Sequence, residues 1–516
     1  MKQKAEPTLT SDEALRMAYG PNVLLDVTGG FIDIDEMPSR LVNRPLDKLR
    51  WQEVIVRQRA DYLEMVKTHF VPTPDAVQIA YALQKLIRAG YIERNPFLAC
   101  KRARRRAIAQ IKPDELRTAP WFSSFARAMV ISGITGLGKS LMVARPLELY
   151  KKTHVHGPSV EGGWEQQLQL VHLSVQMSGD TSRLGFLDNI LQAIDSATGD
   201  TNYYEMYGGP KSRMTTEKLM VKIGQILSQL YCGVLVIDEI QLRNFSGDQD
   251  LVLLFFLRLL NFGIPIVLIG NPNGFDRFTE SAQDTRRLYS GGDFELWPAF
   301  DENDEAWKIY VKGKLEFALL PLGFPVDERT IKEFYRCTGG VPDYFDKLWA
   351  AIQEKSLRSR STSIPFDDIN LVYESAKMNK YRNTIEGLVK RDLNRLAVTK
   401  DIDVTRFADW WGMELSSPSP STTQASAPSE AAPKATSEKK GRGAKDKLPK
   451  PRASRSRQAD VMYRRRQQRA AQAQQAALEQ KEAATGPAAR ANANRSALTA
   501  GAEQLVKPKS ANKPHS

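Results

Sequence analysis

The sequence is poor in cysteine and in long hydrophobic runs. Its three cysteines, Cys100, Cys232 and Cys337, are far apart and form no C-x-x-C pair, which argues against a disulfide framework and against a zinc site. The longest apolar run, residues 251–257, is much shorter than a membrane span. The first twelve residues lack the apolar centre of a signal peptide. We therefore expect a soluble protein of a reducing, cytoplasmic compartment.

The chain has no net positive charge outside its last hundred residues. After residue 415 there are 20 lysines and arginines and 7 acidic residues, so this segment carries +13, the net charge of the whole protein. The remaining chain is neutral, with 53 side chains of each sign. The segment is rich in Ser, Pro and Ala, then in Lys and Arg, which predicts a disordered linker and basic tail. Such a tail suggests a polyanionic partner such as nucleic acid.

Residues 133–140 match the phosphate-binding pattern G-x-x-x-x-G-K-[ST] at every fixed position. An apolar run precedes them and a segment able to open a helix follows, which is the context that this loop requires. The glycines let successive backbone N–H groups point at one anion. Lys139 is expected to reach the β and γ phosphates, and the Ser140 hydroxyl to bind Mg²⁺. The expected nucleotide contacts are Gly133, Ile134, Thr135, Gly136, Leu137, Gly138, Lys139, Ser140 and Leu141.

An acidic element lies ninety-nine residues after Lys139. Residues 234–237 read as a buried strand, and Asp238 and Glu239 come directly after it. Strands of a parallel sheet deliver polar residues at their carboxyl ends, beside the phosphates. We expect Asp238 to hold Mg²⁺ through water and Glu239 to orient and polarise the attacking water.

Two further elements fit the same site. Asn271 follows a strand predicted at residues 264–269, and its amide can hydrogen-bond the γ-phosphate or its water; the alternative is a capping asparagine before proline. Arg286 and Arg287 follow, and one of them is a candidate for an arginine that reaches the nucleotide of a neighbouring subunit. His172 lies within a strand pattern without metal-binding neighbours, so it reads as a core or edge histidine.

Two segments combine features suited to DNA. One is a run of five positive charges at residues 101–106, and the other is a loop at residues 199–213 in which tyrosines alternate with cations. A solvated helix face or subunit contact explains the run equally well, and a mobile surface loop explains the second segment equally well. The candidate DNA contacts are Lys101, Arg102, Arg104, Arg105, Arg106, Tyr203, Lys211 and Arg213.

The pattern predicts an α/β core, a parallel sheet flanked by helices, with additional helical parts. We expect an N-terminal helical extension at 1–110, the nucleotide-binding core at 111–298, a helical lid with further helices at 299–414, and the disordered basic tail at 415–516. Thr73 and Pro74 mark the start of one helix. The aromatic residues at 407–411 read as a docking motif or a last core anchor.

The order of these motifs resembles that of AAA+ ATPases. The segments 236–241 and 264–270, the Arg-Arg-Leu element and Gly339-Gly340-Val341-Pro342 are similar to the TnsC/TniB branch, the ATP-dependent regulators of Tn-type transposons. The likeness covers about residues 50–400. Many AAA+ lids carry an arginine after the glycine turn, whereas this chain has Asp343 there and Lys347 as the nearest cation.

The resemblance implies ATP and Mg²⁺ as ligands, self-assembly into a ring or filament on duplex DNA, and hydrolysis that disassembles it. The implied partners are transposase subunits and a target selector, and the implied location is the nucleoid of a bacterial cytoplasm, with no membrane role. Two alternatives stay open: a helicase loader or initiator-like ATPase, and a signalling NTPase in phage defence.

Overall fold

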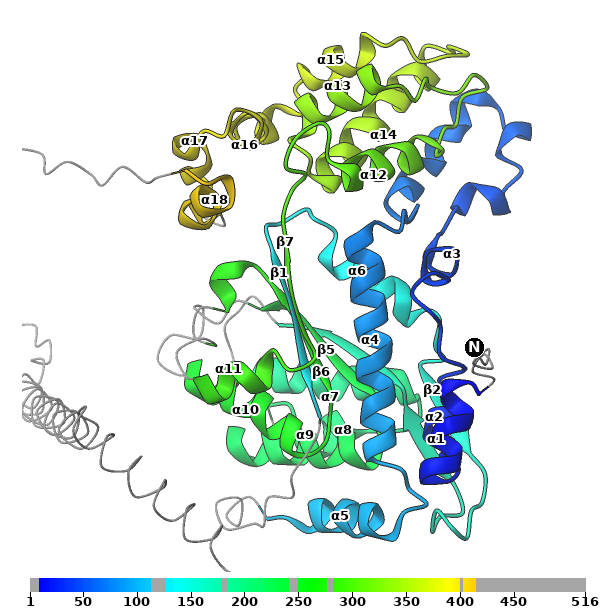
Figure 1. Cartoon of the computed structure of the whole chain (residues 1–516), viewed down its shortest axis with the longest axis vertical. Helices are drawn as coiled ribbons and strands as arrows, with labels where there is room; N and C mark the ends of the chain where they lie inside the picture. Colours follow the sequence, from blue (N-terminus) through cyan, green and yellow to red (C-terminus); the bar gives the residue numbers. More distant parts are fainter. Residues whose placement is uncertain are drawn as a thin grey trace, which may run out of the picture. The chain divides into compact units, whose positions relative to one another are not determined.

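The centre of the fold is a five-stranded parallel sheet with the strand order β4-β5-β6-β1-β7 (Figure 1). The computed structural model describes residues 9–112, 126–177, 183–210, 212–240, 249–275, 278, 282–399 and 402–413. The strands of the sheet are β1 (Ala128–Gly133), β4 (His172–Gln176), β5 (Val234–Ile240), β6 (Ile266–Gly270) and β7 (Gly292–Leu296). The predicted α/β class is confirmed.

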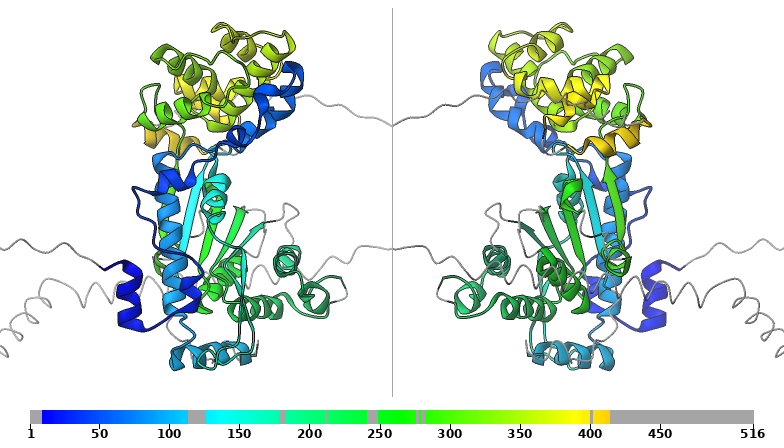
Figure 2. Two further views of the ribbon diagram at one scale, coloured as in Figure 1. Left: turned by 90° about the vertical axis from the view of Figure 1, so that its right-hand side faces the viewer. Right: turned by 90° about the vertical axis from the view of Figure 1, so that its left-hand side faces the viewer.

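Helices cover both faces of the sheet, which is why its inner strands are largely apolar (Figure 2). On β1, Ala128 and Val130 face a core shared with α7 (Arg183–Thr198), α9 (Thr216–Gln229) and α10 (Gln249–Asn261). Met129 and Ile131 face the opposite core, shared with α4 (Pro74–Glu93) and α6 (Lys139–Leu147). The two-residue period of a strand thus divides one short segment between two cores.

Several elements differ from the sequence prediction. The sequence pattern of residues 168–175 predicts a single strand, but the strand is interrupted at Val171. Strand β3 (Gln167–Leu170) pairs with β2 (Thr153–His156) in an antiparallel hairpin, and only β4 joins the sheet. His172 begins this edge strand, and burial lowers its pKa to about 4. Strand β7 was not predicted.

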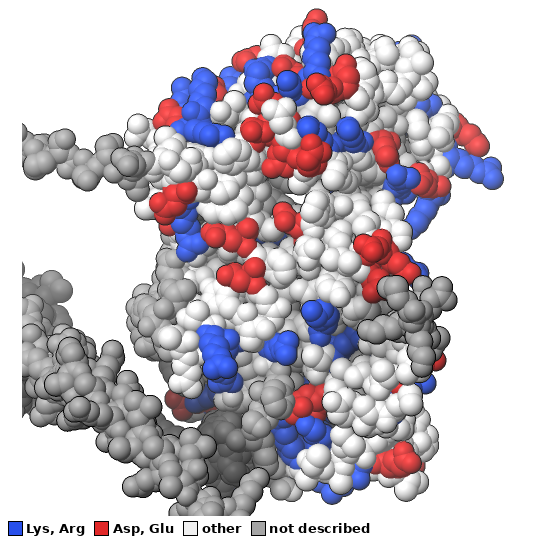
Figure 3. Space-filling model, in the orientation of Figure 1, with Lys and Arg blue, Asp and Glu red and all other residues white. Residues whose placement is uncertain are grey.

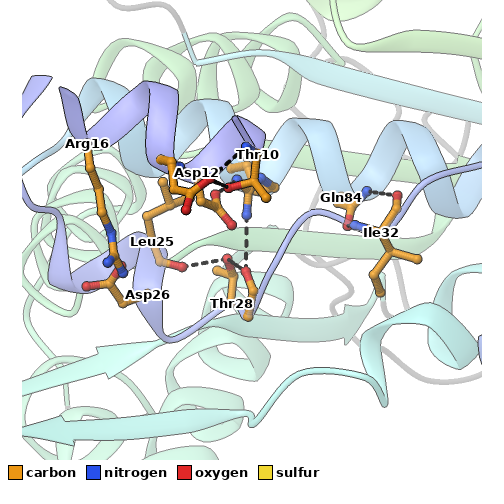
Figure 4. Close-up of polar contacts among 11 residues, drawn as sticks. Thr10, Asp12, Arg16, Leu25, Asp26, Thr28, Ile32 and Gln84 are labelled. Atoms are coloured by element: carbon orange, nitrogen blue, oxygen red, sulfur yellow. Dashed lines mark hydrogen bonds and ion pairs between the residues drawn. The ribbon is translucent and has the colours of Figure 1, made fainter. Parts of the chain in front are cut away.

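The N-terminal segment packs along α4. It forms α1 (Ser11–Tyr19), α2 (Val23–Asp26) and α3 (Met37–Leu41). The Gln84 side chain both donates to and accepts from the backbone of Ile32, at 2.8 Å each (Figure 4). Arg88 forms an ion pair with Asp12 and donates to the Gly29 carbonyl at 3.1 Å. The sequence of residues 31–34 also allows a short hairpin, but none forms there, because the Ile32 backbone bonds to the Gln84 side chain of α4.

The sequence pattern from residue 51 predicts a helix, but the structure has 3₁₀ segments there, η2 (Trp51–Glu53) and the twelve-residue η3 (Val56–Lys67), after η1 (Pro45–Lys48). Their apolar residues pack into the lid, which contains α12 (Glu305–Leu315), α13 (Glu328–Thr338), α14 (Pro342–Arg358) and α15 (Asp368–Tyr373). The mixed spacing of those residues does not give the continuous apolar stripe of an amphipathic α-helix. On the lid part of the surface, charges of both signs are mixed (Figure 3).

The last described elements are α16 (Asn379–Lys390), α17 (Leu393–Ala397) and α18 (Val404–Trp411). Trp410 stacks on Trp297 with ring centroids 4.8 Å apart, Phe407 packs edge-on against Trp297 at 5.1 Å, and Arg406 pairs with Glu295 of β7 at 2.9 Å. The aromatic motif is therefore a core anchor. Within the described ranges no helix is long and apolar enough to cross a membrane. The tail predicted at 415–516 lies outside them.

Candidate functional site

The phosphate-binding pattern forms a tight connection between β1 and α6. Gly138 precedes α6 with a φ of 83°, a conformation that glycine adopts without steric cost. Gly136 has a φ of 96°, and a Cβ there would lie 3.1 Å from the Val341 side chain. A Cβ on Gly133 would lie 2.7 Å from the Leu296 carbonyl oxygen. Gly138 thus allows the backbone to turn, Gly136 allows the loop to approach the lid, and Gly133 allows it to approach β7.

Lys139 turns back over this loop. Its ammonium donates to the carbonyls of Gly133 and Ile134 at 2.7 and 2.8 Å, and lies 3.5 Å from Oδ1 of Asn271. Burial lowers the Lys139 pKa to about 8, against the opposing effect of Asp238. Strand β6 lies between β1 and β5, so Asn271, directly after β6, comes between the loop and the acidic strand end.

Asp238 and Glu239 lie at a β-bulge. The pairing of β5 with β6 shifts between Ile237 and Ile240, so two residues of β5 stand opposite one residue of β6. Asp238 Oδ1 accepts the backbone N–H of Glu239 at 2.8 Å, and Glu239 has a φ of 57°, which is unusual for a residue with a side chain. Bulges redirect side chains at strand ends, and here Glu239 is exposed whereas Asp238 is half-buried.

The strand ends and the loop enclose a cavity of about 360 Å³. Most of its lining was expected from the sequence, and Ile240 and Gly270 were not. The lining residues are Thr135, Gly136, Gly138, Lys139, Ser140, Leu141, Asp238, Glu239, Ile240, Gly270 and Asn271. A lysine, a hydroxyl, two carboxylates and an amide therefore converge from the ends of β5 and β6 and from the N-terminus of α6.

The donor set in this cavity suits Mg²⁺. Ser140 and Asp238 offer a hydroxyl and a carboxylate, and Mg²⁺ sites in nucleotide-binding proteins use one or two such oxygens together with the phosphates. No cluster of three or more His, Cys, Asp or Glu side chains able to hold a metal ion occurs in the part of the chain that the structure describes.

A second, less polar cavity of about 480 Å³ lies on the other side of the loop and shares Thr135, Gly136, Gly138 and Leu141 with the first. The rest of its walls come from three segments that are far apart in the chain, of which the sequence analysis singled out only the Thr73–Pro74 helix start and the Gly339–Pro342 motif. They include Phe70, Val71, Thr73 and Asp75 before and within α4, Trp297 and Pro298 after β7, and Trp307, Tyr310 and Pro342 of the lid. An aromatic and apolar pocket next to a phosphate cavity suits a nucleoside.

The lid contacts the loop directly. The N–H of Asp343, in the first turn of α14, donates to the Gly136 carbonyl at 3.0 Å. Lys347 forms an ion pair with Asp343 and lies over the Tyr381 ring. Many AAA+ lids carry an arginine at the position of Asp343. Here Lys347, the nearest lid cation, is paired with that aspartate.

The two arginines of α11 (Ala282–Leu288) differ in their contacts. Arg287 donates to Oδ1 of Asn261 at 2.5 Å, and burial lowers its pKa. Arg286 is exposed and makes no hydrogen bond or ion pair with a described residue. Neither arginine lines the cavity that contains Lys139 of the same chain.

The basic run forms α5 (Ala99–Gln110), and most of its cations make intramolecular contacts. Lys101 and Arg104 contact Glu93 at 2.7 and 3.5 Å, and Arg102 donates to the Glu161 carbonyl at 2.7 Å. Arg105 donates to the Tyr231 hydroxyl and lies over its ring. Arg106 approaches Gly163. These contacts favour a structural role for α5, and DNA contact by its residues stays a prediction.

The tyrosine loop contains α8 (Tyr203–Tyr207), in which Tyr203 stacks on Tyr207 at 6.4 Å. Asp195 of α7 accepts the N–H groups of Tyr203 and Tyr204, so the loop is fixed to the core. Arg213 is exposed, and Lys211 lies outside the described residues. A DNA role for this loop also stays a prediction.

Residues 124–278 match the protein family described as "AAA domain". No curated protein matches the sequence significantly. Solved structures with some likeness include the ORC2 protein of Aeropyrum pernix with ADPNP and ADP (14% identity, 61% of this chain, 79% of that chain, TM-score 0.33). Others are its ORC1 protein in complex with DNA (15%, 61%, 84%, 0.34) and the RuvB Holliday junction branch migration motor of Thermotoga maritima (13%, 61%, 82%, 0.29). Residues 124–278 are thus similar to the AAA domain family, and the parallel sheet agrees with that match.

Proposed function

We propose that the protein binds and hydrolyses ATP at the cavity between β1, β5 and β6. The observation that carries this proposal is the convergence of Lys139, Asp238, Glu239 and Asn271 on one cavity at the N-terminus of α6. The loop N–H groups and Lys139 hold the phosphates, and the second cavity receives the nucleoside. Mg²⁺, held by Ser140 and Asp238, would neutralise charge on the phosphates.

Glu239 is the proposed base. Its exposed carboxylate, redirected by the bulge, is available to a water that approaches the γ-phosphate in line. Asn271, next to Lys139, orients the same water or the γ-phosphate. Since little covalent chemistry is required of the protein in phosphoryl transfer, positioning and charge account for most of the catalysis.

We propose further that hydrolysis requires a neighbouring copy of the chain. Arg287 is held by Asn261, which leaves Arg286 as the arginine able to reach another subunit's nucleotide. Binding of ATP between two copies then makes assembly dependent on nucleotide.

The cellular role that we propose is regulation of DNA transposition, with assembly on duplex DNA, recruitment of transposase subunits and a target selector, and disassembly on hydrolysis. This part is supported by the resemblance of the sequence motifs and by the +13 charge of the tail. DNA backbone contact from such a tail is not sequence-specific.

Electron microscopy of the full chain with linear duplex DNA tests this function. We expect ordered assemblies on DNA with ATP and Mg²⁺, and none with ADP or with the Lys139→Ala variant. Ordered assemblies that form equally well without nucleotide would contradict the proposal.

A further inference from the structure

Arg94 is a buried cation that has no counter-charge among the described residues. It caps the C-terminal end of α4, and only 9% of its surface is exposed. Its Nε donates to the Gly90 carbonyl at 3.0 Å, but Nη1 and Nη2 are buried without a hydrogen-bond partner. The guanidinium lies 5.4 Å from the centroid of the Tyr91 ring. A guanidinium does not lose its proton in proteins, so burial leaves this charge in need of a partner.

Other cations surround the same place. Arg104 and Arg105 of α5 each have a buried Nε without a partner. Arg105 bonds only to neutral groups: the Tyr231 hydroxyl, the Gln167 side chain and the Gln229 carbonyl. Arg94 and Arg104 both approach Gly263, where a Cβ would lie 3.4 Å from Arg94 Cδ and 3.5 Å from Arg104 Nη2. Arg94 and Arg104 therefore meet beside Gly263, between α4, α5 and the end of α10.

A small cavity of about 20 Å³ lies at this point. It is lined by Glu93, Arg94, Lys101, Arg104, Arg105, Ile108, Ser228, Tyr231 and Phe262. Among the described residues that line it there are four cations and one carboxylate, and Glu93 already contacts both Lys101 and Arg104. The volume suffices for one water-sized particle.

We propose that this cavity binds one small monovalent inorganic anion, such as chloride, and that the anion completes the packing of α5 against the ATPase core. An anion that contacts Arg94 and Arg104 supplies the negative charge that the surrounding protein lacks. A tetrahedral phosphate is too large for the cavity. A DNA phosphate cannot reach the Arg94 terminal nitrogens, because they are buried.

The first test compares the melting temperature of the full chain in sodium chloride and in sodium gluconate at equal ionic strength. We expect a melting temperature higher by about 2 °C or more in chloride, with saturation as the chloride concentration rises. The Arg94→Gln variant should melt at the same temperature in both salts. The matched control is Arg50→Gln, which removes a charge from a side chain that is 87% exposed and should keep the chloride effect.

The second test uses only the wild-type chain, so it does not require that a variant fold. Crystals of the wild-type chain grown in sodium bromide should show an anomalous bromide peak between Arg94 and Arg104. A water molecule in place of that peak, together with equal melting temperatures of the wild type in both salts, would overturn the proposal.

Discussion

Arg287 donates to Oδ1 of Asn261 at 2.5 Å, whereas the adjacent Arg286 is exposed. The two neighbours therefore have different roles. Arg287 connects α11 to the end of α10, whereas the exposed side chain of Arg286 makes no such contact with a described residue. Since the same Asn261 also accepts a hydrogen bond from Arg104 through its carbonyl, at 3.1 Å, this residue joins α11, α10 and α5.

The first prediction separates the two arginines. Arg286→Ala should lower ATP turnover by about 10³-fold, because an arginine that stabilises transition-state charge contributes at least this factor, with an unchanged melting temperature. Arg287→Ala should instead lower the free energy of unfolding by about 1.5–3 kcal/mol, through loss of a charged hydrogen bond. Steady-state hydrolysis and chemical denaturation of both variants measure these effects. The reverse pattern would assign the trans role to Arg287.

The second prediction concerns Glu239. Glu239→Gln keeps the size of the side chain and removes its basicity, so ATP should still bind while turnover falls by about 10²–10⁴-fold. Assemblies on DNA should persist longer than those of the wild type, as followed by the decay of light scattering after dilution. Turnover equal to that of the wild type would exclude Glu239 as the base.

The third prediction concerns pH. Burial lowers the pKa of Lys139 to about 8, below its ordinary value, so in the absence of nucleotide the lysine loses its charge as the pH rises through 8. Because phosphate binding requires the charged form, ATP affinity should fall by up to about tenfold per pH unit above pH 8. The effect on stability has the opposite sign. Between pH 8 and the ordinary lysine value the unfolded chain binds more protons, so this group makes the free energy of unfolding rise with pH.

Titration of a fluorescent ATP analogue between pH 7 and 9.5 measures the affinity. Lys139→Arg is the matched control, since arginine stays charged over this range and its affinity should not change with pH. Equal pH dependence of the wild type and this variant would show that another group controls binding.

The fourth prediction concerns the contact between loop and lid. Gly136→Ala introduces a side chain at a φ of 96° and within 3.1–3.2 Å of Val341 and Asp343, so it should cost about 1–2 kcal/mol and weaken ATP binding. Gly157→Ala is the control, because a Cβ there meets nothing within 4 Å. Thermal unfolding with and without ATP compares the two. Unchanged nucleotide binding by Gly136→Ala would show that the lid contact is dispensable.

The sequence allowed prediction of the parts of the site that are contiguous in the chain. The loop at 133–140 and the ends of β5 and β6 carry recognisable residue patterns, and the carboxyl ends of parallel strands meet at one edge of a sheet. The bulge at Glu239 was not predictable, because it arises from the pairing of β5 with β6. Likewise the second cavity is built from segments before α4 and after β7 that meet only through tertiary packing.

The charges of α5 show a different limit. A run of five cations has the same pattern whether it faces water, DNA or the protein interior. The partners of the cations distinguish these cases. Here the partners are Glu93, which is near in the sequence, and the Tyr231 hydroxyl and the Glu161 carbonyl, which are far away in it.

If a second copy of the chain completes the ATP site, two inactive variants should restore activity when they are mixed. Glu239→Gln has an intact Arg286, and Arg286→Ala has an intact Glu239. We expect each variant alone to hydrolyse ATP at background rate, and an equimolar mixture with DNA to recover a substantial fraction of wild-type turnover. A mixture that stays at the background of the separate variants, although both bind ATP and assemble, would contradict it.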